Sequence, residues 1–115
     1  LILTNSTVNR NQMLISHNKD KKGGLSGQPL FENSNIILKK MFSLTNGQIP
    51  LIGVGGISSG TDCYIKLKSG ASLLQLYTAL VYSGPGLVSK MKNELIDLIK
   101  TDGYKNIKEV IGKSV

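Results

Sequence analysis

The sequence contains few of the residues on which disulfides, metal sites and membrane spans depend. Cys63 is the only cysteine, so neither a disulfide nor a thiolate metal site can form within one chain. The only histidine, His17, lies in a polar stretch and is expected to be a solvated loop residue. No apolar run approaches the roughly 20 residues of a membrane-spanning helix, and no signal peptide is visible. We therefore predict no metal site, and we expect Cys63 to be a small buried side chain.

Arginine occurs once, and this scarcity argues against a nucleic-acid partner despite a formal net charge of +7. The lysines are scattered, with only Lys19, Lys21 and Lys22 tightly grouped. Proteins that bind single-stranded nucleic acid add stacking aromatic side chains to positive charge, and no such aromatic-rich surface is apparent here. A basic nucleic-acid-binding protein is the weakest alternative; steep salt dependence of DNA binding would support it.

Two apolar runs, separated by a short helical pattern, are the most informative part of the chain. The first run lies within residues 49–60 and ends at Gly55 and Gly56. The second run lies within residues 70–80 and ends at Tyr77 and Thr78. Such abrupt ends are typical of buried parallel strands that stop at a loop. We predict strands over residues 50–54 and 72–76 and a helix over residues 61–68, which together form one β/α unit and the start of the next.

The ends of these two strands predict a site for an anion. Gly55 and Gly56 let the backbone approach a ligand closely and are expected to leave N–H groups unpaired at a helix N-terminus. Tyr77 and Thr78 occupy the equivalent place one strand later. A (β/α)8 barrel holds a phosphate in this way after its seventh and eighth strands. The alternatives are a tight turn without a ligand for the glycines and a core aromatic for Tyr77.

The rest of the chain continues the alternation of strands and helices. We predict a strand over residues 1–3, a loop over residues 4–10 and a polar connection over residues 11–27, which is long enough to suggest that it serves a site. A helix capped by Asn33 or Ser34 runs to about Leu44. Arg10 is interpreted as half of a structural ion pair, and Asp62 as a residue that assists a helix N-terminus.

The strongest helical pattern follows Gly84-Pro85-Gly86 and ends at Asp102-Gly103. Its period predicts one apolar stripe and an outer face that includes Lys90 and Glu94. Asn106 and Glu109 then form a capping box for a last short helix. The predicted apolar stripe consists of Val88, Met91, Leu95, Leu98 and Ile99.

Four motifs, in the right order and spacing, give the chain a resemblance to a known family. They are Thr4-Asn-Ser-Thr-Val-Asn-Arg10, Gly23-Gly-Leu-Ser-Gly-Gln-Pro-Leu30, the double-glycine strand, and Gln75-Leu-Tyr-Thr-Ala-Leu80. The chain resembles the C-terminal portion of a class 2, quinone-dependent dihydroorotate dehydrogenase. The resemblance implies an α/β fold in which residues 1–115 are the C-terminal fragment of a single FMN-binding domain, about the last three β/α units of a (β/α)8 TIM barrel. Such a fragment is expected to need the missing N-terminal part as its partner.

The implied activity is the flavin-dependent oxidation of dihydroorotate to orotate, with quinone as electron acceptor, in de novo pyrimidine (UMP) biosynthesis. In this class the catalytic base is a serine upstream of everything in this sequence. No catalytic residue is therefore assigned, and the fragment alone is expected to be inactive. The resemblance also implies peripheral membrane association through an absent N-terminal segment. The membrane would be the bacterial inner membrane, at its cytoplasmic face, or alternatively the mitochondrial inner membrane.

The resemblance also assigns site residues. The cofactor is FMN, and the substrate contacts are Asn5 and Ser6. From its chemistry alone, the Asn5 amide can pair with the N–H and C=O edge of a pyrimidine, or it can simply turn the chain. The cofactor-binding residues implied by the family motifs are Thr4, Gly27, Gly55, Gly56, Tyr77 and Thr78.

The sequence departs from the family pattern at Ser6, where threonine is usual, and at Cys63, where alanine is usual. Two alternatives to the class 2 enzyme stay open. One is another FMN-binding barrel, such as a class 1 dihydroorotate dehydrogenase or a dihydropyrimidine dehydrogenase. The other is a non-catalytic phosphate-binding remnant, and the flanking DNA would discriminate between a divided enzyme and such a remnant.

Overall fold

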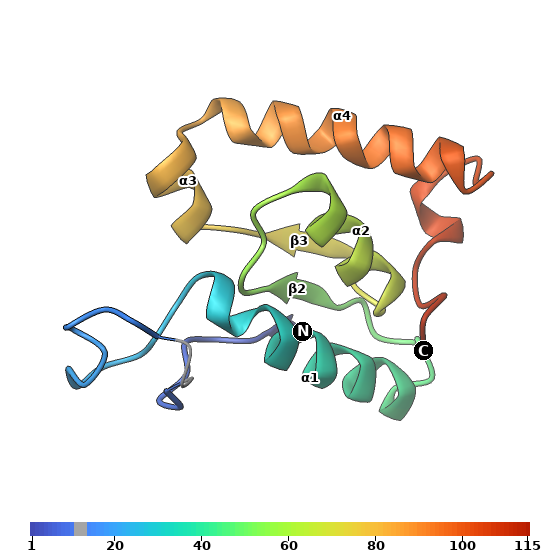
Figure 1. Ribbon diagram of the computed structural model, residues 1–115. Helices are drawn as coiled ribbons and strands as arrows, with labels where there is room; N and C mark the ends of the chain where they lie inside the picture. The colour runs from blue at the N-terminus through green and yellow to red at the C-terminus, as the bar shows by residue number, and fades with distance from the viewer. Residues whose placement is uncertain (11–13) are drawn as a thin grey trace.

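A computed structural model describes residues 1–10 and 14–115 and contains one parallel sheet (Figure 1). The strands β1 (Ile2–Leu3), β2 (Ile52–Val54) and β3 (Leu73–Gln75) lie in the order β1-β2-β3. Ile2 pairs with Ile52, which pairs with Leu73. Parallel neighbours need a crossover connection, and helices supply it here. The three predicted strands are confirmed, although the paired segments are shorter than the apolar runs.

Helices cover one face of the sheet, and the other face is exposed. The row formed by Leu3, Gly53 and Leu74 faces the helices, where Leu38 and Leu51 are fully buried. The neighbouring row points the other way, and there Ile2 and Leu73 are 60% and 63% exposed. Parallel sheets are normally covered on both faces. The bare face is what the side chains of a closed barrel would fill.

Helix α1 (Phe31–Leu44) joins β1 to β2 and follows a single 3-10 turn, η1 (Gln28–Leu30). Its predicted end is confirmed, but its predicted cap at Asn33 or Ser34 is wrong. The helix begins at Phe31, and its N-cap, Leu30, makes no side-chain capping bond. Ser34 is buried instead, and its hydroxyl donates to the carbonyl oxygens of Phe31, at 2.8 Å, or Gly55, at 3.2 Å.

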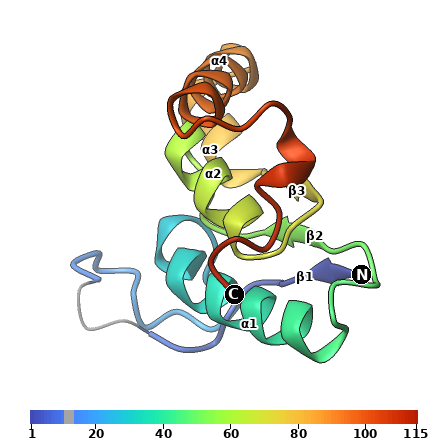
Figure 2. The same ribbon diagram turned by 90° about the vertical axis from the view of Figure 1, so that its right-hand side faces the viewer.

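Helices α2 (Gly60–Lys68), α3 (Thr78–Ser83) and α4 (Gly86–Thr101) complete the fold, with α4 lying along α2 (Figures 1 and 2). The predicted stripe of α4 is correct at Met91, which is buried, but wrong at Val88, which is 36% exposed. Leu87 is buried in its place, against Ile57 and Cys63. The predicted burial of Cys63 is confirmed, and burial raises the pKa of its thiol to about 11.

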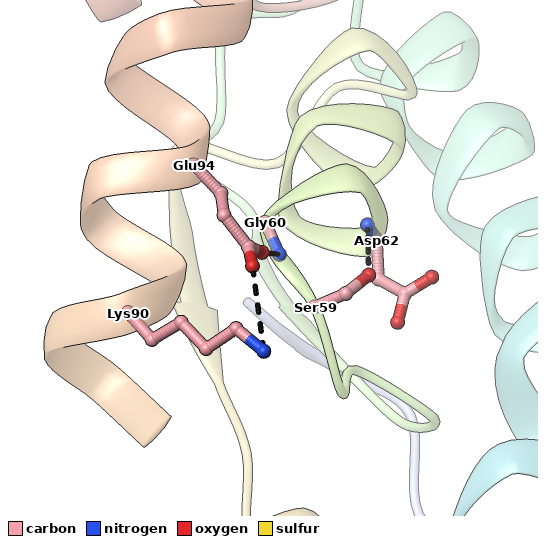
Figure 3. Close-up of polar contacts among 5 residues, drawn as sticks. All are labelled: Ser59, Gly60, Asp62, Lys90 and Glu94. Carbon is pink, nitrogen blue, oxygen red and sulfur yellow. Dashed lines mark hydrogen bonds and ion pairs between the residues drawn. The ribbon is translucent and has the colours of Figure 1, made fainter. Parts of the chain in front are cut away.

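The α2 N-terminus is capped by α4, as Figure 3 shows. The Gly60 N–H donates to Glu94 Oε2 at 2.7 Å, and the Asp62 N–H donates to Ser59 Oγ at 3.1 Å. A Cβ at position 60 would lie 2.3 Å from the Glu94 Cβ, so glycine is needed for this contact. Glu94 was expected to face outward; it turns inward because the first amides of a helix need acceptors. Lys90 Nζ lies 3.8 Å from Glu94 Oε1.

The chain after α4 follows the predicted turn chemistry. Gly103 adopts a φ of 79°, and the Tyr104 N–H donates to the Ile99 carbonyl, which closes the helix. The last predicted helix is a single 3-10 turn, η2 (Ile107–Glu109), capped by Asn106. In the described residues, no helix is both long and apolar enough to cross a membrane.

Candidate functional site

One cavity of about 380 Å³ lies beyond the carboxyl ends of the three strands and brings together all the candidate residues. Figure 1 shows β2 and β3 pointing toward this edge of the sheet. Polar groups that follow neighbouring parallel strands meet at one edge, which explains why residues far apart in sequence converge. The cavity wall includes Thr4, Asn5 and Ser6 after β1, Gly27 before α1, Gly55 and Gly56 after β2, and Tyr77 and Thr78 after β3.

The end of β1 forms a local turn. Asn5 Oδ1 accepts a hydrogen bond from the Ser6 N–H at 2.8 Å, so part of the side chain turns the backbone. Ser6 in turn lies against Gly24, where a Cβ would sit 2.0 Å from Ser6 Oγ. Glycine at position 24 is therefore what lets the returning loop pass over Ser6.

The loop between Arg10 and Gly27 is closed at its base. Thr7 and Leu25 exchange backbone hydrogen bonds of 3.0 and 2.7 Å, which form an antiparallel bridge. The predicted ion pair of Arg10 is wrong, because its guanidinium donates to backbone carbonyls. These are the carbonyl oxygens of Thr7, Val8, Lys19, Lys21 and Gly23, at 2.7 to 3.2 Å. Of the predicted polar connection, residues 11–13 lie outside the described residues. His17 is exposed, as predicted.

The double glycine after β2 is required by packing as well as by backbone conformation. Gly55 and Gly56 have φ values of 106° and 74°. A Cβ at Gly56 would lie 2.6 Å from the Phe31 Cβ, and a Cβ at Gly55 would lie 3.3 Å from the Ser34 Cβ. The turn thus sits tightly against the start of α1, which would require these glycines even without a ligand.

Contrary to expectation, the Gly60, Asp62 and Cys63 amides at the start of α2 all have acceptors within the chain, and Thr61 does not line the cavity. Besides the Gly60 and Asp62 amides described above, the Ser58 N–H donates to Asp62 Oδ2 at 2.9 Å. The predicted role of Asp62 at this helix N-terminus is therefore confirmed. The Gly56 and Ile57 amides, by contrast, donate to no residue that the structure describes. Donors for an anion at this strand end therefore belong to the turn and not to the helix.

The end of β3 meets the loop before α1. Tyr77 is 80% exposed, so it does not belong to the core that the described residues form. Gly27, with a φ of 85°, approaches Thr78 so closely that a Cβ there would lie 3.2 Å from the Thr78 Cγ2. Thr78 and the start of α3 thereby line the same cavity as the double glycine.

The cavity wall is largely apolar, with hydroxyl groups set into it, and within the described part of the chain it carries no charged side chain. Hydroxyl groups are frequent in the wall, where Ser26 and Ser58 join the predicted residues. Ser58 Oγ donates to Asp62 Oδ2 at 2.9 Å or to Gln28 Oε1 at 3.0 Å. Residues 1–10 and 14–115 hold no group of three or more side chains suited to a metal ion.

Sequence reasoning missed Lys66, a fully buried lysine behind the double-glycine turn. Its Nζ donates to Ser34 Oγ at 2.6 Å and to Asn35 Oδ1 at 2.8 Å. Burial lowers the pKa of Lys66 to about 8, while the carboxylates of Asp62 and Glu32 act in the opposite direction. The helical spacing could have predicted this burial, because it places Lys66 on the same buried face of α2 as Cys63 and Leu67.

Comparison with known proteins gives the family. A sequence profile described as dihydroorotate dehydrogenase matches residues 1–99. The chain belongs to the dihydroorotate dehydrogenase family. Its relatives include the mitochondrial dihydroorotate dehydrogenase (quinone) of Oryza sativa subsp. japonica, which is 48% identical over 97% of this chain. The dihydroorotate dehydrogenase (quinone) of Parvibaculum lavamentivorans is 46% identical over the whole chain. The predicted resemblance to the quinone-dependent class is confirmed.

Solved structures of dihydroorotate dehydrogenases also match. The ligand-free enzyme from Eimeria tenella superimposes with a TM-score of 0.95 and 38% sequence identity over 97% of this chain. The same match covers 31% of the Eimeria chain, and the chain covers 24% of the rice relative and 33% of the Parvibaculum relative. The predicted fold is confirmed: three parallel strands alternating with helices match part of the dihydroorotate dehydrogenase barrel.

Proposed function

We propose that this chain supplies the phosphate end of the flavin site and part of the substrate site of a quinone-dependent dihydroorotate dehydrogenase. The whole enzyme would oxidise dihydroorotate to orotate in de novo pyrimidine biosynthesis and pass the electrons to quinone. The observation that carries the proposal is the cavity. Eight residues from three strand ends and one returning loop line it together.

The lining fits the phosphate of FMN. The open amides of Gly56 and Ile57 and the hydroxyl of Thr78 are neutral hydrogen-bond donors, and no carboxylate lines the wall to repel an anion. Thr4 and Gly27 would contact the rest of the flavin, and the exposed Tyr77 backbone would complete the phosphate site. When bound, FMN supplies the two-electron acceptor for the oxidation.

Asn5 and Ser6 would orient the substrate. Although Asn5 Oδ1 accepts from the Ser6 amide, a carbonyl oxygen has a second lone pair, and the side-chain NH2 adds two donors. These groups match the alternating edge of a pyrimidine ring. We assign no catalytic base here; Ser58, for example, is bonded to a carboxylate and to Gln28. The serine base would belong to the remainder of the enzyme.

The same proposal covers the domain and its partners. Residues 1–115 would be the C-terminal part of one FMN-binding barrel, with the rest of that barrel covering the exposed side chains of Ile2 and Leu73. The finished enzyme would associate peripherally with a membrane through a segment outside these residues. The bacterial inner membrane and the mitochondrial inner membrane are the two candidates.

A chimeric enzyme tests the proposal. Residues 1–115 replace the aligned third of the Parvibaculum relative, with which they share 46% identity. We expect the purified chimera to retain FMN and to reduce quinone when dihydroorotate is added. Thr78→Val, which removes the hydroxyl at constant shape, should weaken FMN binding, and Asn5→Ala should raise the KM for dihydroorotate. The unmodified Parvibaculum enzyme is the control.

The outcomes separate the alternatives. A chimera that binds FMN but does not oxidise dihydroorotate would favour a different FMN-binding barrel enzyme or a phosphate-binding remnant. A chimera that folds like the parent enzyme and holds no flavin would overturn the assignment of the phosphate site.

A further inference from the structure

Lys66 is a buried cation that forms no ion pair with any residue in the described part of the chain, and both of its hydrogen-bond acceptors are neutral. Its Nζ is bonded to Ser34 Oγ and Asn35 Oδ1 and lies 5.1 Å from the centre of the Phe31 ring. Burying a charge without a hydrogen-bonded counter-ion costs free energy, and the carboxylates of Asp62 and Glu32 offset only part of this cost. Even with its lowered pKa of about 8, the ammonium remains mostly charged at pH 7.

The partners of Lys66 are the residues that support the double-glycine turn. Phe31 packs against Gly56, and Ser34 packs against Gly55 and can donate to its carbonyl. The stem of Lys66 runs past Gly53 of β2, where a Cβ would lie 3.3 Å from Lys66 Cδ. The charge therefore sits directly behind the turn, on the opposite side from the cavity.

This placement complements the uncharged lining of the cavity. An anion there meets only neutral donors, and the nearest buried positive charge lies one layer behind them. In the low dielectric of a protein interior, water screens such a charge little. We propose that Lys66 supplies, from behind the Gly55–Gly56 turn, the positive charge that balances the phosphate of the cofactor. The inference rests on the proposed function and extends it to a residue outside the cavity wall.

A purely structural lysine would behave differently. If Lys66 only held α1 against α2, its loss would weaken every ligand of the cavity alike. If it acts through its charge, the loss should be specific to the phosphate. A unit charge within about 10 Å of an anion, at an effective dielectric constant of about 20, strengthens binding by about tenfold or more. The comparison of FMN with riboflavin, which lacks the phosphate, shows whether the loss is specific to the phosphate. Lys66→Gln, which keeps a hydrogen-bond donor, then separates the effect of the charge from the effect of the hydrogen bonds that support the turn.

The experiment titrates the flavin-free chimera with FMN and with riboflavin, following flavin fluorescence. Lys66→Met keeps the length of the side chain and removes the charge. We expect it to raise the Kd for FMN about tenfold or more and to leave the Kd for riboflavin within about twofold. Lys68→Met is the matched control on the same helix; Lys68 lies over the Tyr64 ring, 5.2 Å from its centre, and should affect neither flavin.

Lys66→Gln, which keeps a hydrogen-bond donor without the charge, gives the same test if the methionine variant does not fold. Equal losses for both flavins, or no loss for either, would overturn the role of the charge while leaving the flavin site intact. Failure of the unsubstituted chimera to bind FMN would instead count against the proposed function itself.

Discussion

Replacing Gly56 by alanine should damage the fold at the double-glycine turn, and the structure sets the size of the effect. Gly56 has a φ of 74°, and an alanine in this left-handed region costs about 1–2 kcal/mol. The new methyl group would also lie 2.6 Å from the Phe31 Cβ and 2.7 Å from its backbone N and Cα. Overpacking of this kind costs a further 1–3 kcal/mol or so. We expect Gly56→Ala to lower the free energy of unfolding by about 2–5 kcal/mol.

Gly103→Ala isolates the backbone contribution. Gly103 has a similar φ of 79°, but a Cβ there would meet no atom within 4 Å. Its cost should therefore be limited to about 1–2 kcal/mol. Urea unfolding of the chimera described above, followed by far-UV circular dichroism, measures both variants. Equal losses for Gly56→Ala and Gly103→Ala would refute the argument that contact with Phe31 requires the glycine.

Three further predictions concern buried or bridging charges. Burial lowers the pKa of Lys66 from 10.5 to about 8. Between about pH 8 and pH 10.5 the folded chain therefore binds fewer protons than the unfolded chain. The free energy of unfolding should rise with pH in this range. From pH 7 to 9 the unfolding free energy should rise by about 1 kcal/mol, because the raised pKa of Cys63 offsets only a smaller part of the gain. Urea unfolding of the chimera at both pH values should show the rise, and Lys66→Met should abolish it. Glu94→Ala leaves the Gly60 amide without its acceptor and should lower the free energy of unfolding, measured by thermal unfolding, by about 1–2 kcal/mol. Lys90→Ala is the control: it removes only the exposed ion pair with Glu94, at 3.8 Å, and should change stability by less than about 0.5 kcal/mol. Arg10→Lys removes the planar guanidinium, which donates to several backbone carbonyls at once. Limited trypsin digestion should therefore cut the chain faster within residues 14–24. An unchanged rate would mean that the guanidinium does not hold this loop in place.

Local patterns were enough to predict the strands and most of the helix ends. Apolar runs that stop at small residues marked β2 and β3, and Asp102-Gly103 marked the end of α4. These signals depend on neighbours within a few residues, because turn chemistry and the strand period are properties of the local backbone.

The predictions that failed concern side chains whose partners are distant in sequence. Ser34 looked like a helix cap but is bonded near Gly55, and Glu94 looked like a surface residue but accepts from Gly60. Arg10 suggested an ion pair, yet its partners are carbonyls of a loop that folds back on it. In each case the polar group satisfies a backbone group that only the folded chain brings near.

The order of residues along the chain is enough to say which of them follow each strand, and the parallel topology then brings all eight candidate residues to one cavity. Which backbone donors remain unpaired at that edge depends on the folded chain. Asp62 and Glu94 accept from the Ser58 and Gly60 amides, whereas the Gly56 and Ile57 amides donate to no residue that the structure describes. The burial of Lys66 behind the turn likewise depends on the folded chain. The physical reason is that hydrogen-bond satisfaction and desolvation depend on what surrounds a group in space, whereas the order of strands and turns is set along the chain.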